Sequence, residues 1–246
     1  MKTPKVQIIG PGKAGLSFYL ALQSVGWDVL EPLGKASKLK DLESNADFIL
    51  ITTPDKEIPI VAKALHKTKA VIIHTSGATQ LDSLLPHKRR ASLHPLVSMP
   101  EAEIGKERLL DDAWFAIDGD PDAERIVDAL GGNTFRVTDD NRSVYHAAAC
   151  IASNHLIVLM AQVQRLSMKI DIPFQSFLNL SSSTLAGLDD LNPAEALTGP
   201  AARGDEETLK SHLESLPEKE RHLYQCLAQG AKDLATQSII NESENI

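Results

Sequence analysis

Lys5-Val-Gln-Ile-Ile-Gly10-Pro-Gly12-Lys-Ala-Gly15 joins an apolar segment directly to a glycine-rich turn of the form Gly-x-Gly-x-x-Gly. Val6–Ile9 is typical of a buried strand. After Gly15 the apolar residues recur at helical spacing until Gly26 ends the pattern. The stretch therefore predicts a strand, a tight turn and a helix in direct succession.

Each glycine of this turn has a separate physical role. Gly10 permits the sharp turn off the strand, Gly12 lets a pyrophosphate approach the backbone, and Gly15 lets the helix pack closely on the sheet. The free N–H groups at the start of the helix, which include those of Lys13 and Ala14, would face the phosphates. We therefore predict a dinucleotide-binding site, with an ordinary strand–turn–helix as the alternative.

The composition is that of an ordinary soluble globular protein of one or two domains, since 43% of the 246 residues are hydrophobic and 24% are charged. The formal net charge of −8 argues against nucleic acid or an anionic membrane as the main partner. Cys150 and Cys226 have neither metal nor redox spacing, so we expect reduced thiols, no metal site and a cytoplasmic location. We expect no signal peptide before the first strand.

Strands and helices alternate up to about residue 137, after which the pattern is entirely helical. The alternation predicts an α/β fold, with a doubly wound Rossmann-type parallel sheet over residues 1–138 and an all-helical domain over 139–246. The expected strands are residues 6–9, 27–30, 48–52, 70–74, 91–93 and 114–117, and the expected helices are residues 35–43, 57–65, 122–130, 141–168, 174–183, 206–216 and 218–238.

The longest apolar stretch, residues 147–163, lies in the first helix of the second domain. Ser153, Asn154 and His155 interrupt it, and its flanks are polar and charged. We interpret it as a buried core helix rather than a membrane span.

The choice between NAD and NADP depends on the end of the second strand and the loop after it. Glu31 falls near the position at which NAD-binding proteins carry an acid, but as an inner strand residue. The loop beyond it carries Lys35, Ser37 and Lys38, two cations and a hydroxyl suited to a 2′-phosphate. This pattern favours NADP, with solvated lysines at a helix start as the alternative.

Polar groups follow three of the predicted strands, at the edge where a doubly wound sheet binds its ligand. Thr53 and Pro54 follow one strand and should border the nicotinamide side of the cofactor. His74 and Ser76 end the next strand, and His94 ends the one after. These groups could hold a carboxylate or carbonyl oxygen. Local turn hydrogen bonds are the alternative.

The helix that opens the second domain carries a polar stripe, because His146, Cys150, Ser153 and Asn154 share one side over about two turns. Buried polar groups need partners, since an unpaired one costs about 1–3 kcal/mol. A stripe that faces a substrate would meet this requirement, and so would hydrogen bonds within a helical core.

A second polar segment, residues 196–205, surrounds Thr198 and Arg203 with glycine and proline, which is typical of a rigid loop. Asp205 is expected to cap the helix that begins at Glu206. Arg203 would then bind a substrate carboxylate or pair with Asp205. Thr198 and Asp205 are further candidates for substrate binding.

These motifs resemble a family of Rossmann-like, NADP-dependent oxidoreductases with an uncharacterised helical C-terminal domain (DUF2520), relatives of ketopantoate reductase and pyrroline-5-carboxylate reductase. The resemblance implies NADPH as cofactor and a homodimer formed through the helical domains. The matching pieces run in order along nearly the whole chain: Gly10-Pro-Gly12-Lys-Ala-Gly15, His74-Thr-Ser-Gly-Ala78, Ser92-Leu-His-Pro-Leu96, Tyr145-His-Ala-Ala-Ala149 with Asn154, and Leu197-Thr-Gly-Pro-Ala-Ala-Arg-Gly-Asp205.

In ketopantoate reductase the helix that enters the second domain carries a catalytic lysine and, two turns on, an asparagine. By this resemblance, the two positions are occupied here by His146 and Asn154, so the lysine is absent. A histidine can also donate a proton, and its ordinary pKa is nearer neutrality than that of lysine.

The resemblance and the spacing together suggest the reduction of a small keto acid, or of a cyclic imine. We expect His146 to protonate the substrate oxygen, Asn154 to orient the carbonyl and Arg203 to bind the carboxylate. His94 and Ser76 would line the junction between cofactor and substrate. A non-catalytic NADP-binding sensor or scaffold is the alternative, which the missing lysine favours and the polar stripe does not.

Overall fold

The computed structural model describes residues 3–34, 39 and 45–244, with side chains up to residue 236. Two compact units follow one another along the chain, Met1–Asn154 and His155–Ile246. The division lies inside a long helical run, whereas the sequence pattern placed it before residue 139. The predicted helix over residues 35–43 and the loop side chains of Lys35, Ser37 and Lys38 lie outside the described residues.

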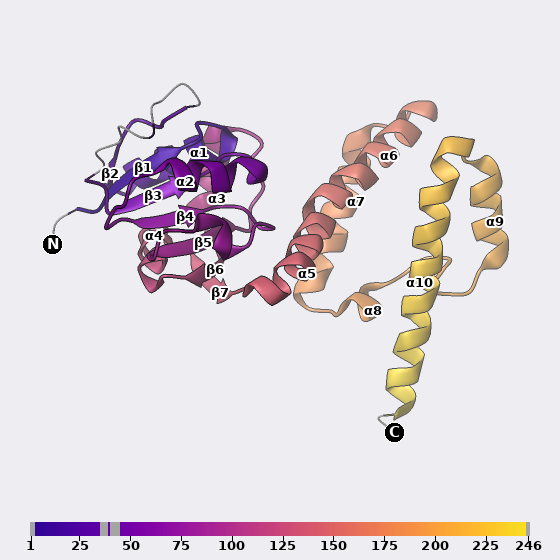
Figure 1. The fold of residues 1–246 in the computed structure, drawn as a ribbon. Helices are drawn as coiled ribbons and strands as arrows, with labels where there is room; N and C mark the ends of the chain where they lie inside the picture. Colours follow the sequence, from indigo (N-terminus) through magenta and orange to yellow (C-terminus); the bar gives the residue numbers. More distant parts are fainter. Residues whose placement is uncertain (1–2, 35–38, 40–44, 245–246) are drawn as a thin grey trace. The chain divides into compact units, whose positions relative to one another are not determined.

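A seven-stranded sheet forms the centre of the first unit (Figure 1). The strand order is β2-β1-β3-β4-β5-β6-β7, so the order reverses at β1, with β2 on one side and β3 on the other. This is a doubly wound arrangement, and the predicted Rossmann-type fold is confirmed. The strands are β1 (Lys5–Ile9), β2 (Asp28–Val29), β3 (Phe48–Ile51), β4 (Val71–His74), β5 (Arg90–Pro95), β6 (Trp114–Gly119) and β7 (Asn133–Arg136).

The expectation of a parallel sheet is wrong at one pair of strands. Strands β5 and β6 are antiparallel, with Leu93 opposite Ile117, while the other neighbours run parallel. The segment between them contains α3 (Ala102–Leu109) and returns to the end of the sheet at which β5 finishes. Strand β6 therefore starts from that end and runs back along β5.

Helices cover both faces of the sheet because side chains alternate along each strand. Val6 and Ile8 of β1 join the cluster under α1 (Lys13–Ser24), α3 and α4 (Glu124–Leu130). Ile9 joins the cluster on the opposite face, under α2 (Ile58–Ala64) and the short helix η3 (Leu81–Leu84). The short helices η2 (Asp55–Glu57) and η4 (Pro121–Ala123) precede α2 and α4.

A long helical run then begins, as predicted, with α5 (Asp139–Cys150), a π-helical turn η5 (Ile151–His155) and α6 (Leu156–Lys169). By length and composition this run is long and apolar enough to cross a membrane, and none of its most apolar window is buried. Ile157 and Val158 are 68% and 55% exposed. The expectation of a buried core helix is therefore wrong for the single chain, because the described elements leave these apolar side chains exposed.

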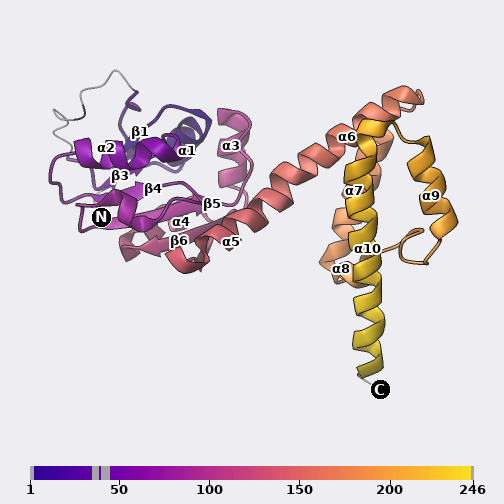
Figure 2. The same cartoon turned by 45° about the vertical axis from the view of Figure 1, so that its right-hand side comes forward.

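The second unit continues with α7 (Phe174–Ala186), the short helices η6 (Gly187–Asp189) and α8 (Pro193–Ala196), α9 (Glu206–Ser215) and α10 (Glu218–Glu244). Within this unit α6 lies beside α7, and α9 lies beside α10 (Figures 1 and 2). Glu220 joins α10 to α6, because its carboxylate accepts two hydrogen bonds from Arg165 and its carbonyl accepts one from Gln162.

Candidate active site

The glycine turn after β1 is tightly packed at two of its three glycines. Gly10 has a φ of +110°, and a Cβ there would lie 2.8 Å from the backbone of Thr52 and Thr53. A Cβ at Gly15 would overlap the carbonyl oxygen of Gly10. Gly10 thus permits the turn and Gly15 permits close packing of α1, as predicted.

Gly12 differs from the other two glycines because a Cβ there would meet no atom within 4 Å. It is the residue that precedes the first turn of α1, where backbone N–H groups lack helical partners. Lys13 and Ala14 form the start of that turn, and the Lys13 side chain is exposed. The backbone at Gly12 is therefore open to an approaching group.

A cavity of about 560 Å³, here called the glycine-turn cavity, lies beside this turn. It sits where β1 and β3 end, at the point where the strand order reverses, which is the usual ligand crevice of such a sheet. Thr53 and Pro54 line it, and the Thr53 hydroxyl is buried without a hydrogen-bond partner among the described residues. The other lining residues are Ile9, Gly10, Pro11, Gly12, Leu33, Gly34, Leu39, Thr52, Glu57, Ile60 and Val61.

A second cavity of about 760 Å³, here called the histidine cavity, lies between the end of β5 and helix α5. Predicted site residues His94, His146 and Asn154 line it together, and Cys150 and Ser153 of the polar stripe join them. None of its described lining residues is Lys, Arg, Asp or Glu. The remaining lining residues are Pro95, Leu96, Val97, Ser98, Met99, Phe135, Tyr145, Ala148, Ala149 and Ala152.

Tyr145 is a polar lining residue to which the sequence analysis gave no role. Its hydroxyl lies 2.6 Å from Nδ1 of His94, and the two rings meet edge to face. Burial raises the pKa of Tyr145 to about 12, while the positive charge of Arg142 acts in the opposite direction. Burial, and then the neighbouring His146 and Arg142, lower the pKa of His94 to about 4. At neutral pH the pair is therefore a neutral imidazole bonded to a neutral phenol.

His146 lies beside this pair, with its ring centroid 5.9 Å from that of His94. Its Nδ1 is buried without a hydrogen-bond partner among the described residues, and its Nε2 lies 3.7 Å from Sγ of Cys150. A Cβ at Gly77 would lie 2.5 Å from Nδ1 of His146 and 3.0 Å from the His94 ring. The absence of a side chain at Gly77 thus makes room for both histidines.

His74 and Ser76 line neither cavity in the described residues. The His74 ring is fully buried, and neither of its nitrogens has a hydrogen-bond partner among the described residues. Burial, and then the charge of Arg142, lower its pKa to about 3. The Ser76 hydroxyl accepts hydrogen bonds from the N–H groups of Ala78 and Thr79, which is the local turn role left open by the sequence.

Thr198, Arg203 and Asp205 belong to the second unit, so the histidine cavity is described without them. Asp205 precedes α9 and accepts the N–H and hydroxyl of Thr208, which confirms the predicted helix cap. These two bonds also lower the pKa of Asp205. Thr198 and Arg203 are both exposed in this segment.

No group of three His, Cys, Asp or Glu residues in the described part of the chain could hold a metal ion. The polar side chains that line the histidine cavity are two imidazoles, a phenol, a thiol, hydroxyls and an amide. Such groups donate and accept hydrogen bonds, and they can hold or transfer a proton.

A family model described as Domain of unknown function (DUF2520) matches residues 113–231. Among curated proteins no match is found. Among solved structures, BF3122 from Bacteroides fragilis, described as a candidate NADP oxidoreductase, is 20% identical with a TM-score of 0.78 and covers 94% of this chain and 98% of its own. Protein TM1727 from Thermotoga maritima is also 20% identical, with a TM-score of 0.73 and coverage of 95% and 99%.

A pyrroline carboxylate reductase from Plasmodium falciparum, crystallised with NADP bound, has a TM-score of 0.63 at 10% identity and covers 96% of this chain and 99% of its own. Identities this low establish a shared fold. The fold extends over both units of the chain, because each of these structures covers almost all of it.

Proposed function

We propose that this chain, a Rossmann-like protein that carries a DUF2520 domain, is an NADPH-dependent reductase of a small keto acid. The observation that carries the proposal is the glycine turn, where tight packing at Gly10 and Gly15 leaves Gly12 open beside a cavity at the switch point of the sheet. A turn that served only to connect a strand to a helix would not require open space at Gly12.

The described residues at this turn fit a dinucleotide. The N-terminus of α1 offers unpaired N–H groups and a positive dipole end to a pyrophosphate. The Thr53 hydroxyl is a buried donor without a partner among the described residues at the cavity wall. Lys35, Ser37 and Lys38 would bind the 2′-phosphate of NADP, and the NADP-bound structure of similar fold supports that choice over NAD.

When bound, NADPH supplies a hydride to the keto carbon of the substrate. The chain must then deliver a proton to the oxygen and hold the substrate in place. His146 would donate that proton from the wall of the histidine cavity, and Asn154, which lines the same cavity, would orient the carbonyl. His94 would line the substrate site beside them.

The carboxylate of a keto acid needs a cationic partner, and the described lining of the histidine cavity contains no Lys or Arg. On the sequence motif alone, we propose Arg203 as the residue that binds this carboxylate, with Thr198 as a further substrate-binding residue. An Arg203→Met variant should then raise the KM for a 2-keto acid about tenfold or more while it leaves reduction of an uncharged aldehyde of the same length unchanged.

The function is tested by adding a panel of 2-keto acids and cyclic imines to the chain with NADPH. Oxidation of NADPH is measured as the loss of its absorbance. The reductase proposal expects turnover of at least one keto acid and loss of that turnover in His146→Gln. Turnover of imines alone would move the substrate class to C=N groups. NADPH binding without turnover of any of these compounds would instead favour a non-catalytic sensor. The observation that favours a sensor is that position 146 is a histidine and not a lysine.

We also propose a homodimer through the helical unit, in the cytoplasm. Ile157 and Val158 of α6 and Leu180 of α7 are more than half exposed in the single chain. Helix α6 also carries Gln162 and Arg165, whose side chains donate hydrogen bonds to Glu220 of α10, so another part of this helix contacts polar groups of the protein. A second copy would cover the apolar side chains.

A further inference from the structure

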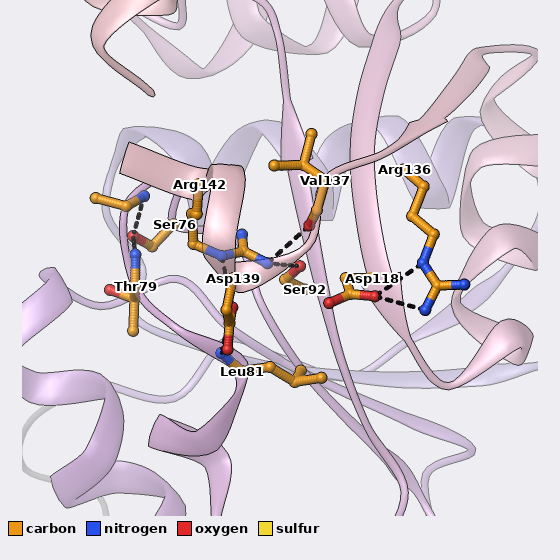
Figure 3. A network of polar contacts seen from close by, with 10 residues as sticks. Ser76, Thr79, Leu81, Ser92, Asp118, Arg136, Val137, Asp139 and Arg142 are labelled. Atoms are coloured by element: carbon orange, nitrogen blue, oxygen red, sulfur yellow. Dashed lines mark hydrogen bonds and ion pairs between the residues drawn. The ribbon is translucent and has the colours of Figure 1, made fainter. Parts of the chain in front are cut away.

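The largest fully buried side chain in the described residues is that of Arg142, near the start of α5, which is 1% exposed. Its Nε donates to Asp139 at 2.9 Å, and its Nη2 donates to the Ser92 hydroxyl at 2.9 Å and to the Val137 carbonyl at 3.2 Å (Figure 3). A buried guanidinium needs such partners, because removal of its charge from water is costly. No role in dinucleotide binding explains this side chain.

The bonds of Arg142 join separate segments of the chain. Ser92 belongs to β5, Val137 directly follows β7, and Asp139 is the first residue of α5. Both carboxylate oxygens of Asp139 also accept the N–H of Leu81, at the start of η3 (Figure 3). The guanidinium and its carboxylate therefore fix the first turn of α5 on the carboxyl end of the sheet.

These segments also carry the polar wall of the histidine cavity. Ser92 lies two residues before His94 on the same strand, and Arg142 lies three residues before Tyr145 on the same helix. His94 and Tyr145 are hydrogen-bonded to each other at 2.6 Å. The His94–Tyr145 bond joins β5 to α5 at the surface of the cavity. Arg142 joins the same strand and helix behind that surface, through its bond to Ser92.

We infer that Arg142 is a positioning residue of the histidine cavity, which holds α5 against β5 so that Tyr145 and His146 stay in place beside His94. The inference rests on the proposed function only in that this cavity receives the substrate. Arg142 itself lines neither cavity in the described residues, so it acts through the residues it positions.

The charge of Arg142 supports this role. It lowers the pKa of both His94 and His74, after the larger effect of burial, and so favours the neutral form of both imidazoles. The other charged or titratable groups that act on His94 are His146 of α5 and Asp55 of η2, with Tyr145 bonded to its ring. Loss of the Arg142 charge should therefore raise the His94 pKa.

Three variants separate positioning from general stability. Arg142→Lys keeps a charge but loses the planar fork that bonds three groups at once. Ser92→Ala removes one of those bonds and keeps Arg142. Arg136→Gln is the matched control, because Arg136 also bonds a neighbouring strand, through Asp118, but lies at the surface with its side chain 74% exposed (Figure 3).

The first readout is kinetic. With the keto acid that the panel identifies, Arg142→Lys should lower kcat by about 100-fold, because a shift of about 1 Å in reacting groups costs that much. The dissociation constant for NADPH should not change, because the glycine-turn cavity does not involve Arg142. Arg136→Gln should match the wild-type chain in both. Wild-type kcat in folded Arg142→Lys and Ser92→Ala chains would overturn the inference.

The second readout needs no substrate and therefore stands apart from the proposed function. Titration of the His94 ring by NMR, assigned with His94→Gln, should show its pKa rise above about 4 when the double variant Arg142→Gln/Asp139→Asn removes the Arg142 charge, while burial and His146 should keep it below 6.5. The double variant avoids leaving the Asp139 carboxylate without its partner. An unchanged His94 pKa and an unchanged Tyr145 ring environment in the folded double variant would also overturn the inference.

Discussion

In the first unit, apolar side chains from both faces of the sheet are buried in two clusters, whereas the helices of the second unit leave many of theirs exposed. Of the described side chains beyond residue 154, Leu209 is the single apolar one that is buried. The other buried ones are polar, namely Gln162, Ser167 and Glu220. The two units therefore differ in what keeps them folded.

The difference follows from geometry. A sheet places side chains on two faces, and helices on both faces bury them within one chain. In the second unit α6 packs on α7, and α10 packs on α8 and α9, but this packing leaves apolar side chains such as Ile157, Val158 and Leu180 exposed. We therefore expect the first unit to depend on its internal packing and the second to depend on a second copy.

The largest expected effect is at the tightest contact of the first unit. Gly15→Ala should lower the free energy of unfolding by about 3 kcal/mol, because its Cβ would overlap the Gly10 carbonyl in a backbone contact that cannot relax easily. Gly12→Ala is the control, since a Cβ there meets nothing within 4 Å, and should cost less than about 1 kcal/mol. Urea unfolding of both variants measures this, and equal costs would contradict the account of the turn.

The next effect concerns the second unit. Ile157→Glu should weaken self-association about 30-fold, since a buried interface side chain of this kind contributes about 2 kcal/mol. Sedimentation equilibrium measures the dissociation constant. Val25→Glu, an equivalent change of an exposed apolar residue in the first unit, should leave it unaltered. A wild-type chain that is monomeric at all concentrations would remove the proposed dimer.

A third effect is a pH dependence of the first unit. The folded-state pKa values of His74 and His94 are lowered to about 3 and about 4, so the unfolded chain binds more protons between these values and pH 6.5. The contribution of these neutral histidines to the free energy of unfolding is fully present above pH 6.5. It falls as the pH drops, by up to about 1.4 kcal/mol per pH unit for each histidine. His74→Leu should make the fall less steep, while His66→Leu at an exposed loop should not. Chemical denaturation between pH 5 and 7 measures the free energy of unfolding against pH. An unaltered slope in His74→Leu would contradict the lowered pKa of His74.

The smallest expected effect is at the end of β3. The Thr52 hydroxyl donates to the carbonyl of Gly10 at 2.7 Å and lies 3.2 Å from that of Ile9, beside the glycine turn. Thr52→Val keeps the shape and loses this bond, so it should cost about 1 kcal/mol of unfolding free energy. Thr68→Val, where the hydroxyl accepts a single local hydrogen bond from Ala70, provides a comparison that should cost less. Equal effects would mean that the Thr52 bond adds nothing specific to the turn.

Local patterns in the sequence were sufficient for the first strand, its glycine turn and most helices, because the residues that decide these elements are neighbours. Strand β7 was missed because Asn133–Arg136 alternates between half-buried and exposed residues and contains a single large apolar side chain. Helix α3 was missed because Ala102–Leu109 carries few apolar residues, and its Gly105 has a packing role beside Ser17. The direction of β6 depends on the path of residues 96–113, which no local pattern encodes.

The candidate site divides in the same way. His94, His146 and Asn154 were predicted from strand ends and helical spacing, and the structure brings them to one cavity. The roles of Tyr145 and Arg142 were not predicted, because each depends on contacts with strand β5, about 50 residues earlier. The spacing of Asp139 and Arg142, one helical turn apart, was the available signal, but such pairs are common on exposed helix faces.

Calorimetric titration of the full chain measures whether the glycine turn of the first unit binds NADPH, as we propose. We expect a saturable heat with NADPH, weaker binding of NADH, and a dissociation constant at least about tenfold higher for Gly12→Ala, whose added methyl group occupies the open backbone. Absence of heat with both coenzymes, or equal binding by a folded Gly12→Ala chain, would contradict the account.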